Sequence, residues 1–185
     1  TIAGMKSWKK LSQKTLLEHD RLNVYEDEVE LPNGHKTQYI HFGKHHDAAC
    51  VIGIRNDGKI LVQKEYSYPP RQWMYQFPGG GIDTNETPGQ GAAREFAEEA
   101  NLKGDLQHIG KFYMDNRRRE DLFHVFIATN LSEGEAPADP EEEFETHWMS
   151  EEEIDQKIYS GKIVNYTLLS AWSYYKAHKA YRGQN

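Results

Sequence analysis

Alternating hydrophobic and polar residues indicate that the first elements of this chain are β-strands. Residues 21–31 and 35–42 alternate on either side of "PNG" at 32–34, a strong turn signal, and so predict an antiparallel hairpin. Residues 47–56 are apolar enough for a buried strand. The turn signal "NDG" then leads into another expected strand at 59–66.

The rest of the chain mixes strands with a few helices. Further strands are expected at residues 73–77, 106–114, 122–130 and 143–150. Apolar residues at helical spacing, together with helix-end signals, predict helices at residues 88–100, 151–161 and 165–181. Because strands outnumber helices and do not alternate strictly with them, the pattern favours an α+β fold over a doubly wound sheet.

The composition is that of a globular protein. The chain has 185 residues, of which 37% are hydrophobic and 12% aromatic, enough for one domain with a full core. The formal net charge of −7 argues against a partner that is a nucleic-acid polymer. No uncharged apolar stretch approaches the ~18 residues that a membrane span needs. The single cysteine, Cys50, cannot form a disulfide within the chain, which favours a reducing, cytoplasmic setting.

The helix expected at residues 88–100 has clear signals at its start. Thr87 is a good N-cap, and Pro88 suits the first helical position. Gln90 lies three residues after Thr87, which makes a capping box. The helix therefore begins just after Glu86.

Three glutamates crowd one side of this helix. Glu95, Glu98 and Glu99 lie at i, i+3 and i+4, and like charges at these spacings destabilise a helix by roughly 0.2–0.5 kcal/mol per pair. A hard divalent cation would explain them, because oxygen is its preferred ligand and the glycine loop ahead of the helix can supply backbone carbonyls. Arg94 can hold one carboxylate in place. The alternative is a solvated acidic face on an ordinary amphipathic helix.

The arrangement resembles the Nudix box, in which a glycine, a glutamate and the group R-E-apolar-x-E-E-x-G-apolar stand at fixed gaps. The matching residues here are Gly80, Glu86, Arg94, Glu95, Phe96, Glu98, Glu99, Asn101 and Leu102. Asn101 is the one departure, since the family has glycine there. That glycine ends the helix, usually with a positive φ, and asparagine is the next-best residue for this conformation.

Beyond the box, the order of elements resembles the ADP-ribose pyrophosphatase branch of the Nudix family over most of residues 8–180. The resemblance implies the Nudix α/β/α sandwich, with a mixed sheet and an N-terminal antiparallel hairpin. It divides the chain into an N-terminal hairpin segment, residues 1–47, for dimerisation and substrate contact, and a Nudix hydrolase domain, residues 48–185. It also implies a homodimer that completes the active site.

The activity implied by the resemblance is metal-dependent hydrolysis of the pyrophosphate bond in a nucleoside diphosphate linked to another moiety. The leading substrate is ADP-ribose or a related nucleotide sugar, which would give a nucleoside monophosphate and a sugar phosphate. Mg²⁺ is the expected metal, and Mn²⁺ could substitute. The implied metal ligands are Glu95, Glu98, Glu99 and the carbonyl of Gly79. Arg94 would orient a box carboxylate, while Gly80 and Glu86 would support the loop.

The branch also takes a glutamate from a loop beyond the box, as catalytic base or extra metal ligand. Glu142 is the nearest match, with Glu141 and Glu143 as neighbours. The alternative is that these are solvated charges ahead of a strand. We group Glu142 with Glu98 and Arg94 as the candidate catalytic residues.

Four residues are expected to contact the substrate. Arg71 can fork onto a phosphate, and Trp73 can stack on a base, although core packing would explain Trp73 equally well. Where the branch tends to have a proline-containing loop, this chain has Arg117, Arg118 and Arg119. An alternating strand would aim Arg117 and Arg119 at the site and Arg118 away from it. The alternative is a solvated hairpin tip.

Two other functions stay open at this point. A Nudix-like domain can sense nucleotides without cleaving them, but such a module is expected to lose box carboxylates, and this chain keeps every charged box position. The other is a nucleotide-pool-cleaning pyrophosphohydrolase that acts on modified nucleoside triphosphates. The long N-terminal hairpin segment favours the sugar-diphosphate branch instead.

Overall fold

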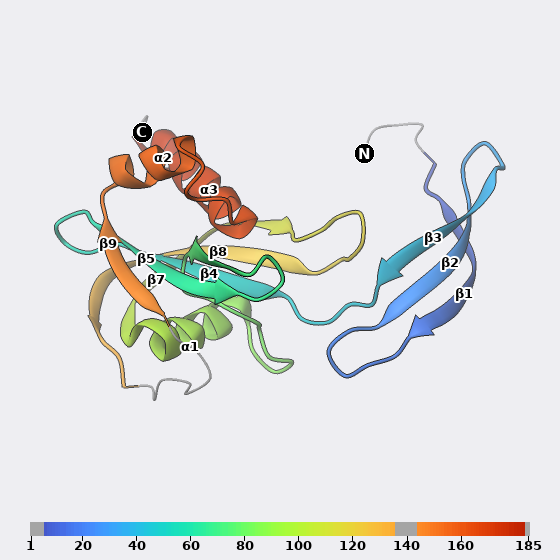
Figure 1. Cartoon of the computed structure of the whole chain (residues 1–185), viewed down its shortest axis with the longest axis horizontal. Helices are drawn as coiled ribbons and strands as arrows, with labels where there is room; N and C mark the ends of the chain where they lie inside the picture. The colour runs from blue at the N-terminus through green and yellow to red at the C-terminus, as the bar shows by residue number, and fades with distance from the viewer. Residues whose placement is uncertain (1–5, 136–143, 184–185) are drawn as a thin grey trace. The chain divides into compact units, whose positions relative to one another are not determined.

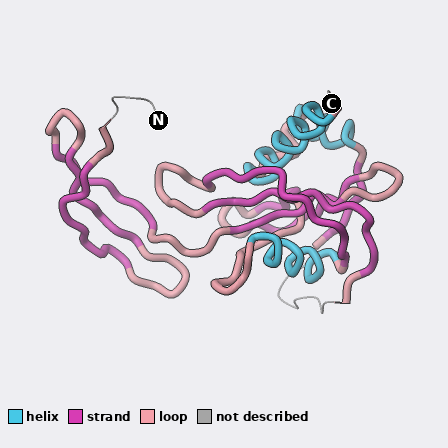
Figure 2. The backbone as a smooth tube through the Cα atoms, turned by 180° about the vertical axis from the view of Figure 1, so that it is seen from behind, coloured by secondary structure: helices cyan, strands magenta, loops and turns pink. Residues whose placement is uncertain are grey.

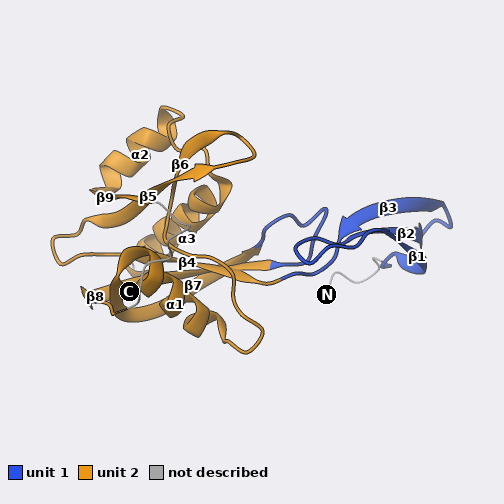
Figure 3. Cartoon of the chain, turned by 60° about the horizontal axis from the view of Figure 1, so that its bottom comes forward, with its two compact units in different colours: residues 1–45, 113–121 blue, residues 46–112, 122–185 orange. Residues whose placement is uncertain are grey.

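The computed structural model describes residues 6–135 and 144–183. Its elements, in chain order, are β1 (Lys9–Leu17), β2 (Val24–Glu30), β3 (Lys36–Phe42), β4 (Ala48–Gly53), β5 (Ile60–Ser67), β6 (Gln72–Gln76), α1 (Pro88–Ala100), β7 (Leu102–Tyr113), β8 (Leu122–Glu133), β9 (Glu145–Met149), α2 (Glu151–Tyr159) and α3 (Tyr166–Arg182). The sheets are ordered β1-β2-β3, β4-β8-β7 and β6-β5-β9. Two compact units result, coloured separately in Figure 3: unit 1 has residues 1–45 and 113–121, and unit 2 has residues 46–112 and 122–185.

Unit 1 is an antiparallel sheet in which β2 lies between β1 and β3. The predicted hairpin is present as β2 and β3, and Leu31 N–H donates to the His35 carbonyl at 2.8 Å across its turn. The sequence patterns did not predict β1, which is exposed at nearly every position. Residues 113–121, which are the last residue of β7 and the loop from β7 to β8, belong to this unit. Phe42 N–H at the end of β3 donates to the Arg118 carbonyl of that loop at 2.7 Å.

Unit 2 contains strands of both directions, because β4 and β8 are parallel while β5 pairs antiparallel with β6 and β9. Helix α1 covers one side of these strands and helices α2 and α3 cover the other (Figure 1). The same layers are seen from behind in Figure 2. The α+β class and the α/β/α sandwich are therefore confirmed, and α1 has the predicted bounds.

One hydrophobic cluster of the core of unit 2 lies between α1 and the strands. Its buried members are Ala49, Val51, Leu61, Ile82, Ala92, Phe96, Phe126 and Ala128. Phe96 anchors α1 and reaches β4 at Gly53, where an added Cβ would lie 2.9 Å from the Phe96 ring. Truncating a buried phenylalanine to alanine typically costs ~3–5 kcal/mol. The apolar face of α1 thus sets the position of the glutamates on its other side.

Hydrogen bonds join α2 and α3 on the opposite side of the strands. The Trp172 indole N–H donates to Asp155 at 2.7 Å, and the Tyr175 hydroxyl donates to Glu151 at 2.9 Å. These bonds satisfy the polar ends of two buried aromatic residues. Among residues 6–135 and 144–183, no helix has both the length and the apolar character to cross a bilayer.

Candidate active site

Helix α1 begins and ends with the capping interactions that its sequence predicts. The Thr87 hydroxyl accepts from the Gln90 N–H at 3.3 Å, and the Gln90 side chain accepts from the Thr87 N–H at 2.9 Å. At the other end, Asn101 takes the left-handed conformation with φ 51° and ψ 41°, and its N–H donates to the Ala97 carbonyl at 3.0 Å. Asparagine thus ends the helix here, in the conformation that glycine adopts most easily.

Arg94 brings the carboxylates of this region together. Its Nε donates to Glu86 at 2.9 Å, and its Nη1 donates to Glu95 at 2.8 Å and to Glu98 at 3.0 Å. Its Nη2 also donates to the Gly81 carbonyl at 2.8 Å. A single guanidinium therefore fixes the glycine loop and three acidic side chains. This network explains how Glu95 and Glu98 can lie close together on one helix, because charge-assisted hydrogen bonds to the same guanidinium are strong and offset their repulsion.

The glycine loop lies against both β4 and the glutamates. Gly79 has φ +151°, and its N–H donates to the Glu99 carboxylate at 2.9 Å. A Cβ at Gly79 would fall 2.1 Å from the Ala49 carbonyl oxygen of β4. A Cβ at Gly80 would fall 2.7 Å from the carboxyl carbon of Glu95. Glycine is needed at position 79, where the neighbouring atoms are β4 backbone, whereas at position 80 an added Cβ would displace the Glu95 carboxylate.

The local electrostatics follow from Arg94 and from burial. The hydrogen bond from Arg94 lowers the pKa of Glu86 below its usual 4.5. Burial raises the pKa of Glu95, and the bond from Arg94 opposes that shift. Burial, and then the nearby charge of Glu99, raise the pKa of the Cys50 thiol, so Cys50 stays neutral and is a poor nucleophile. Cys50 therefore offers no thiolate in this region, whose ionisable groups are mainly carboxylates.

The donor set suits a hard divalent cation. Glu95, Glu98 and Glu99 offer carboxylate oxygens within about one helical turn, and a carboxylate that accepts one hydrogen bond keeps further acceptor sites. The missing side chain of Gly80 leaves the approach to Glu95 open. Within the described residues, no three acidic, histidine or cysteine side chains already converge as a metal site. Arg94 binds Glu95 and Glu98 through one nitrogen, Nη1, while the Glu99 carboxylate accepts from the Gly79 N–H.

Gln63 of β5 is a further residue of this site, which the sequence patterns did not single out. Its side chain is fully buried, and its amide nitrogen donates to the Glu99 backbone carbonyl at 2.9 Å. That carbonyl is in the last turn of α1, where helix carbonyls have no intrahelical partner. Gln63 therefore fixes the end of the helix that carries Glu99. The one available signal was a polar residue inside the apolar run "ILVQ".

Arg71 and Trp73 lie at the β5–β6 hairpin of unit 2. Arg71 is in the turn with φ 54° and is exposed. Trp73 is 46% exposed, so the core-packing alternative is wrong for it, and its ring meets the Tyr66 ring edge-on at 5.9 Å between centroids. Trp73 and Lys64 also line a hollow of about 470 Å³. An exposed indole beside a hollow can stack on a flat ligand.

The arginines at 117–119 lie in unit 1, and the expected strand alternation is wrong for them. Residues 116–118 form a turn in which the Asp115 carbonyl accepts from the N–H groups of Arg118 and Arg119, at 2.9 and 2.8 Å. Arg118 donates to the Ile40 carbonyl at 2.7 Å, and Arg119 lies 3.7 Å from the buried carboxylate of Asp121. Two of the three side chains thus have partners within unit 1.

The remaining predicted residue, Glu142, lies outside the described residues, as do Glu141 and Glu143. The structure therefore brings together Gly79, Gly80, Glu86, Arg94, Glu95, Glu98 and Glu99. Arg71 and Trp73 belong to unit 2 but make none of these contacts, and Arg117 and Arg119 lie in unit 1.

Comparison with known proteins places the glycine loop and α1 inside a region that matches a protein family. Residues 44–169 match the family described as "NUDIX domain", which takes in the whole of α1 and its glycine loop. The ADP-ribose pyrophosphatase of Bacillus subtilis (strain 168) is 27% identical over 184 residues, covering 95% of this chain and 99% of that protein. The methanol dehydrogenase activator of Bacillus methanolicus is 30% identical over 118 residues, which is 63% of each chain.

A solved structure described as an ADP compounds hydrolase has the same fold. It matches with a TM-score of 0.88 over 98% of both chains, at 18% sequence identity. The similarity therefore extends over nearly the full length of this chain, and at this identity it concerns the fold.

Proposed function

The chain belongs to the NUDIX family, and on this premise we propose that it hydrolyses the pyrophosphate bond of a nucleoside diphosphate linked to another moiety. ADP-ribose or a related nucleotide sugar is the substrate class that we favour. The name of the relative that aligns with 95% of this chain, ADP-ribose pyrophosphatase, supports that choice. The oxygen of a water molecule would form a bond to one phosphorus atom while the bond from that phosphorus to the bridging oxygen breaks, and the products would be a nucleoside monophosphate and a sugar phosphate.

The observation that carries this proposal is the set of glutamates held by Arg94 behind the glycine loop. On a solvated acidic face, the carboxylates would not accept hydrogen bonds from a half-buried arginine or from the backbone of a glycine loop. Retention of every charged position of the motif also speaks against a domain that only senses nucleotides. The arrangement suits a reaction in which negative charge gathers on phosphate oxygens.

Members of this family generally use a divalent metal, and we propose Mg²⁺ here, with Mn²⁺ as a substitute. Glu95, Glu98, Glu99 and the Gly79 carbonyl would hold it. Bound divalent cations supply charge neutralisation at phosphate and an activated water. Arg94 orients the carboxylates of Glu86, Glu95 and Glu98, and its bond to the Gly81 carbonyl holds the loop against the helix.

Glu142 is proposed as the general base that accepts the proton of the attacking water. The resemblance of its loop to the ADP-ribose pyrophosphatase branch supports this role, and Glu141 and Glu143 are the neighbours that would replace it if the alignment is shifted by one position. A base acts chiefly in the transition state, so its loss should lower kcat more than it changes KM.

Substrate contacts are proposed from Trp73, Arg71, Arg117 and Arg119. Trp73 is the candidate for stacking on the base, because its ring is exposed beside a hollow. Arg117 is the stronger candidate of the two loop arginines for a phosphate contact. Arg119 already lies near Asp121 and over the Phe42 ring.

We propose a homodimer located in the cytoplasm. Resemblance to the ADP-ribose pyrophosphatase branch and the exposed apolar residues of unit 1, among them Trp8 and Ile40, support the dimer. Cys50, buried and without a disulfide, suits a reducing compartment. Light scattering at micromolar concentration should report twice 21.4 kDa, and a fully active monomer would contradict a shared site.

The test of the function is a substrate screen with identified products. Purified protein with Mg²⁺ is incubated with ADP-ribose, other nucleoside diphosphate sugars, dinucleoside polyphosphates and nucleoside triphosphates, and products are identified by mass. We expect AMP and ribose 5-phosphate from ADP-ribose, and no reaction with excess chelator. Preferred cleavage of triphosphates would favour a nucleotide-pool-cleaning enzyme. Binding of nucleotides without any turnover would favour a sensing module.

A further inference from the structure

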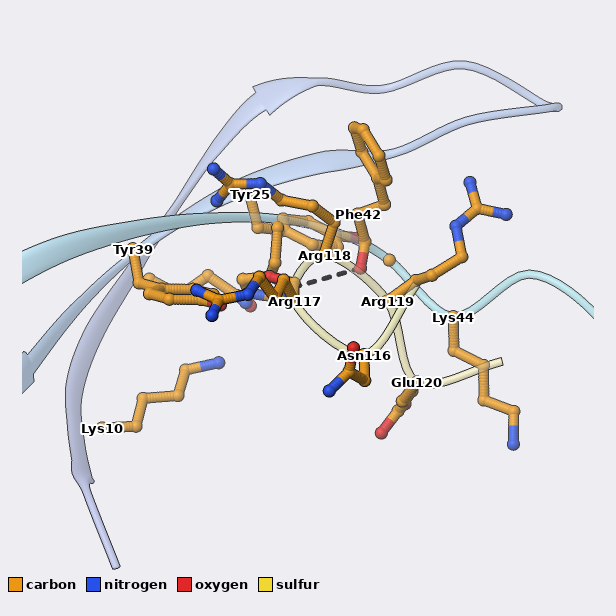
Figure 4. Close-up of a pocket in the computed structure, with 13 residues that line it drawn as sticks. Lys10, Tyr25, Tyr39, Phe42, Lys44, Asn116, Arg117, Arg118, Arg119 and Glu120 are labelled. Atoms are coloured by element: carbon orange, nitrogen blue, oxygen red, sulfur yellow. Dashed lines mark hydrogen bonds between the residues drawn. The ribbon is translucent and has the colours of Figure 1, made fainter. Parts of the chain in front are cut away.

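Unit 1 contains a pocket of its own, and no residue of the glutamate motif is among the residues that line it. It has a volume of about 470 Å³ and lies between β1, β3 and the loop of residues 116–120 (Figure 4). All of its lining residues belong to unit 1. The pocket is therefore a feature of the N-terminal sheet together with the loop that joins β7 to β8.

The lining of this pocket is strongly cationic in an acidic protein. Five Lys and Arg side chains line it, namely Lys10, Lys44, Arg117, Arg118 and Arg119, against a single carboxylate, Glu120. Unit 1 as a whole has ten Lys and Arg residues and nine Asp and Glu residues, a net charge of +1, so the excess negative charge of the chain lies in unit 2, with a net charge of −8. Such a cluster attracts anions over a distance of about one Debye length, which is ~8 Å at physiological salt, and charges farther away are largely screened.

Arg117 is the side chain best placed to meet a ligand. Its backbone is fixed, because the Tyr39 hydroxyl donates to its carbonyl and its N–H donates to Asp115 at 3.2 Å. Its guanidinium makes no hydrogen bond or ion pair with any residue in 6–135 or 144–183, whereas Arg118 and Arg119 have partners. A fixed backbone under an uncommitted guanidinium is suited to forked binding of phosphate oxygens.

A buried carboxylate orients the opposite wall. Asp27 is 8% exposed, and its Oδ2 lies 3.2 Å from the Lys10 ammonium and 3.1 Å from Nε2 of His41. The other ring nitrogen of His41, Nδ1, lies 3.1 Å from the Phe42 carbonyl oxygen. Asp27 thus holds Lys10 at the pocket, where Figure 4 shows it on the side opposite Lys44.

We propose that this pocket binds a phosphate group of a small molecule, and that it does so without a divalent metal. Arg117 would make the main contact, and Lys10 would supply a second positive charge across the pocket. The inference rests on the proposed function for the source of the phosphate, which is either the nucleotide or the sugar phosphate product. The binding itself involves no residue of the glutamate motif.

The experiment is isothermal titration calorimetry of the full-length protein in excess EDTA, at fixed ionic strength. The ligands are inorganic phosphate, AMP and ribose 5-phosphate, and the organic ligand that binds more tightly identifies the source. We expect one site in the wild type and at least ~10-fold weaker binding in Arg117→Ala, since a lost charge-assisted hydrogen bond has an effect of this size. Arg117→Lys should recover part of the affinity.

Two control variants locate the site. Arg21→Ala removes an exposed arginine of unit 1 that does not line the pocket, and it should bind as the wild type does. Glu99→Gln should abolish turnover and leave binding in EDTA unchanged, which separates this inference from the proposed function. Melting curves establish that each variant is folded.

Three results would overturn the proposal. The first is that none of the three ligands binds the wild type at millimolar concentration. The second is that Arg117→Ala binds as tightly as the wild type. The third is that Glu99→Gln weakens binding as much as Arg117→Ala, which would place the phosphate at the glutamate helix instead.

Discussion

The three consecutive glycines ahead of α1 should respond differently to the same added methyl group. In Gly80→Ala the new Cβ would lie 2.7 Å from the Glu95 carboxyl carbon and 2.8 Å from both of its oxygens. Ordinary contact begins at 3.4 Å, so the carboxylate must move by ~0.7 Å. Arg94 holds that carboxylate at 2.8 Å, and the bond is strained or broken by the shift.

The consequence for activity follows from geometry. A misplacement of ~1 Å in a catalytic constellation can cost ~100-fold in rate. We therefore expect Gly80→Ala to lower kcat/KM for ADP-ribose by roughly 10- to 100-fold and to raise the Mg²⁺ concentration needed for half-maximal rate. The melting temperature should change by only a few degrees, because Glu95 is a side chain and can give way.

The neighbouring glycines provide matched controls. Gly79→Ala would put a Cβ 2.1 Å from the Ala49 carbonyl oxygen, at a φ of +151°. Backbone cannot yield as a side chain does, and the strained dihedral alone costs ~1–3 kcal/mol, or roughly 2–12 °C in melting temperature for a chain of this size. Gly81→Ala meets nothing within 4 Å, so both activity and stability should stay near wild type.

The assay combines steady-state kinetics over a Mg²⁺ series with differential scanning calorimetry of all three variants. The reasoning fails if Gly80→Ala keeps wild-type kcat/KM and Mg²⁺ dependence, or if Gly81→Ala loses as much activity as Gly80→Ala. It also fails if Gly79→Ala melts at the wild-type temperature, because the collision with β4 would then not exist.

Four further outcomes test the site and unit 1. Glu99→Gln should keep the fold and lower kcat at least ~100-fold, because metal stabilisation is worth several kcal/mol, and near-normal turnover would remove Glu99 from the metal site. Glu142→Gln should lower kcat with little change in KM, as measured on ADP-ribose. Arg118→Ala should lower the melting temperature, because the hydrogen bond of Arg118 to the Ile40 carbonyl of β3 at 2.7 Å is lost. An unchanged melting temperature would show that this hydrogen bond does not stabilise unit 1. The hydrogen bond from Arg94 lowers the pKa of Glu86 below 4.5, so ionised Glu86 stabilises the folded state fully above pH 4.5, and this stabilisation is lost as the pH falls through the lower pKa of the folded state. The difference in melting temperature between the wild type and Glu86→Gln should therefore shrink in acid. A difference that stays constant with pH would contradict this.

Local signals explain why α1 could be predicted with its correct ends. Thr87, Pro88 and Gln90 define its start within four residues, and Asn101 defines its end through its own conformation. The Nudix-like spacing of the glutamates is equally local, since it occupies a single loop and helix. The spacing alone did not predict that Arg94 binds three carboxylates, because its contact with Glu86 depends on how the loop folds.

The features that sequence patterns missed depend on contacts between distant residues or on weak alternation. Strand β1 is exposed on both faces, so it has no hydrophobic period to read. The loop arginines follow Asp115, whose side chain and carbonyl accept from the next N–H groups and convert an expected strand into a turn. Gln63 meets the Glu99 carbonyl across 36 positions of sequence, which only the packing of α1 against β5 brings together.

The charge of the glutamate site explains why the arrangement is useful and not merely tolerated. Glu86, Glu95 and Glu98 share one guanidinium, so together with Arg94 they keep a formal charge of −2, and Glu99 adds one more negative charge beside them. Repulsion of this kind destabilises a metal-free helix, by roughly 0.2–0.5 kcal/mol for each close pair on an exposed surface. An incoming diphosphate would add further negative charge at the same place. Arg94 can orient these groups but cannot neutralise them, so the excess charge favours divalent cations as the groups that join the protein to its substrate.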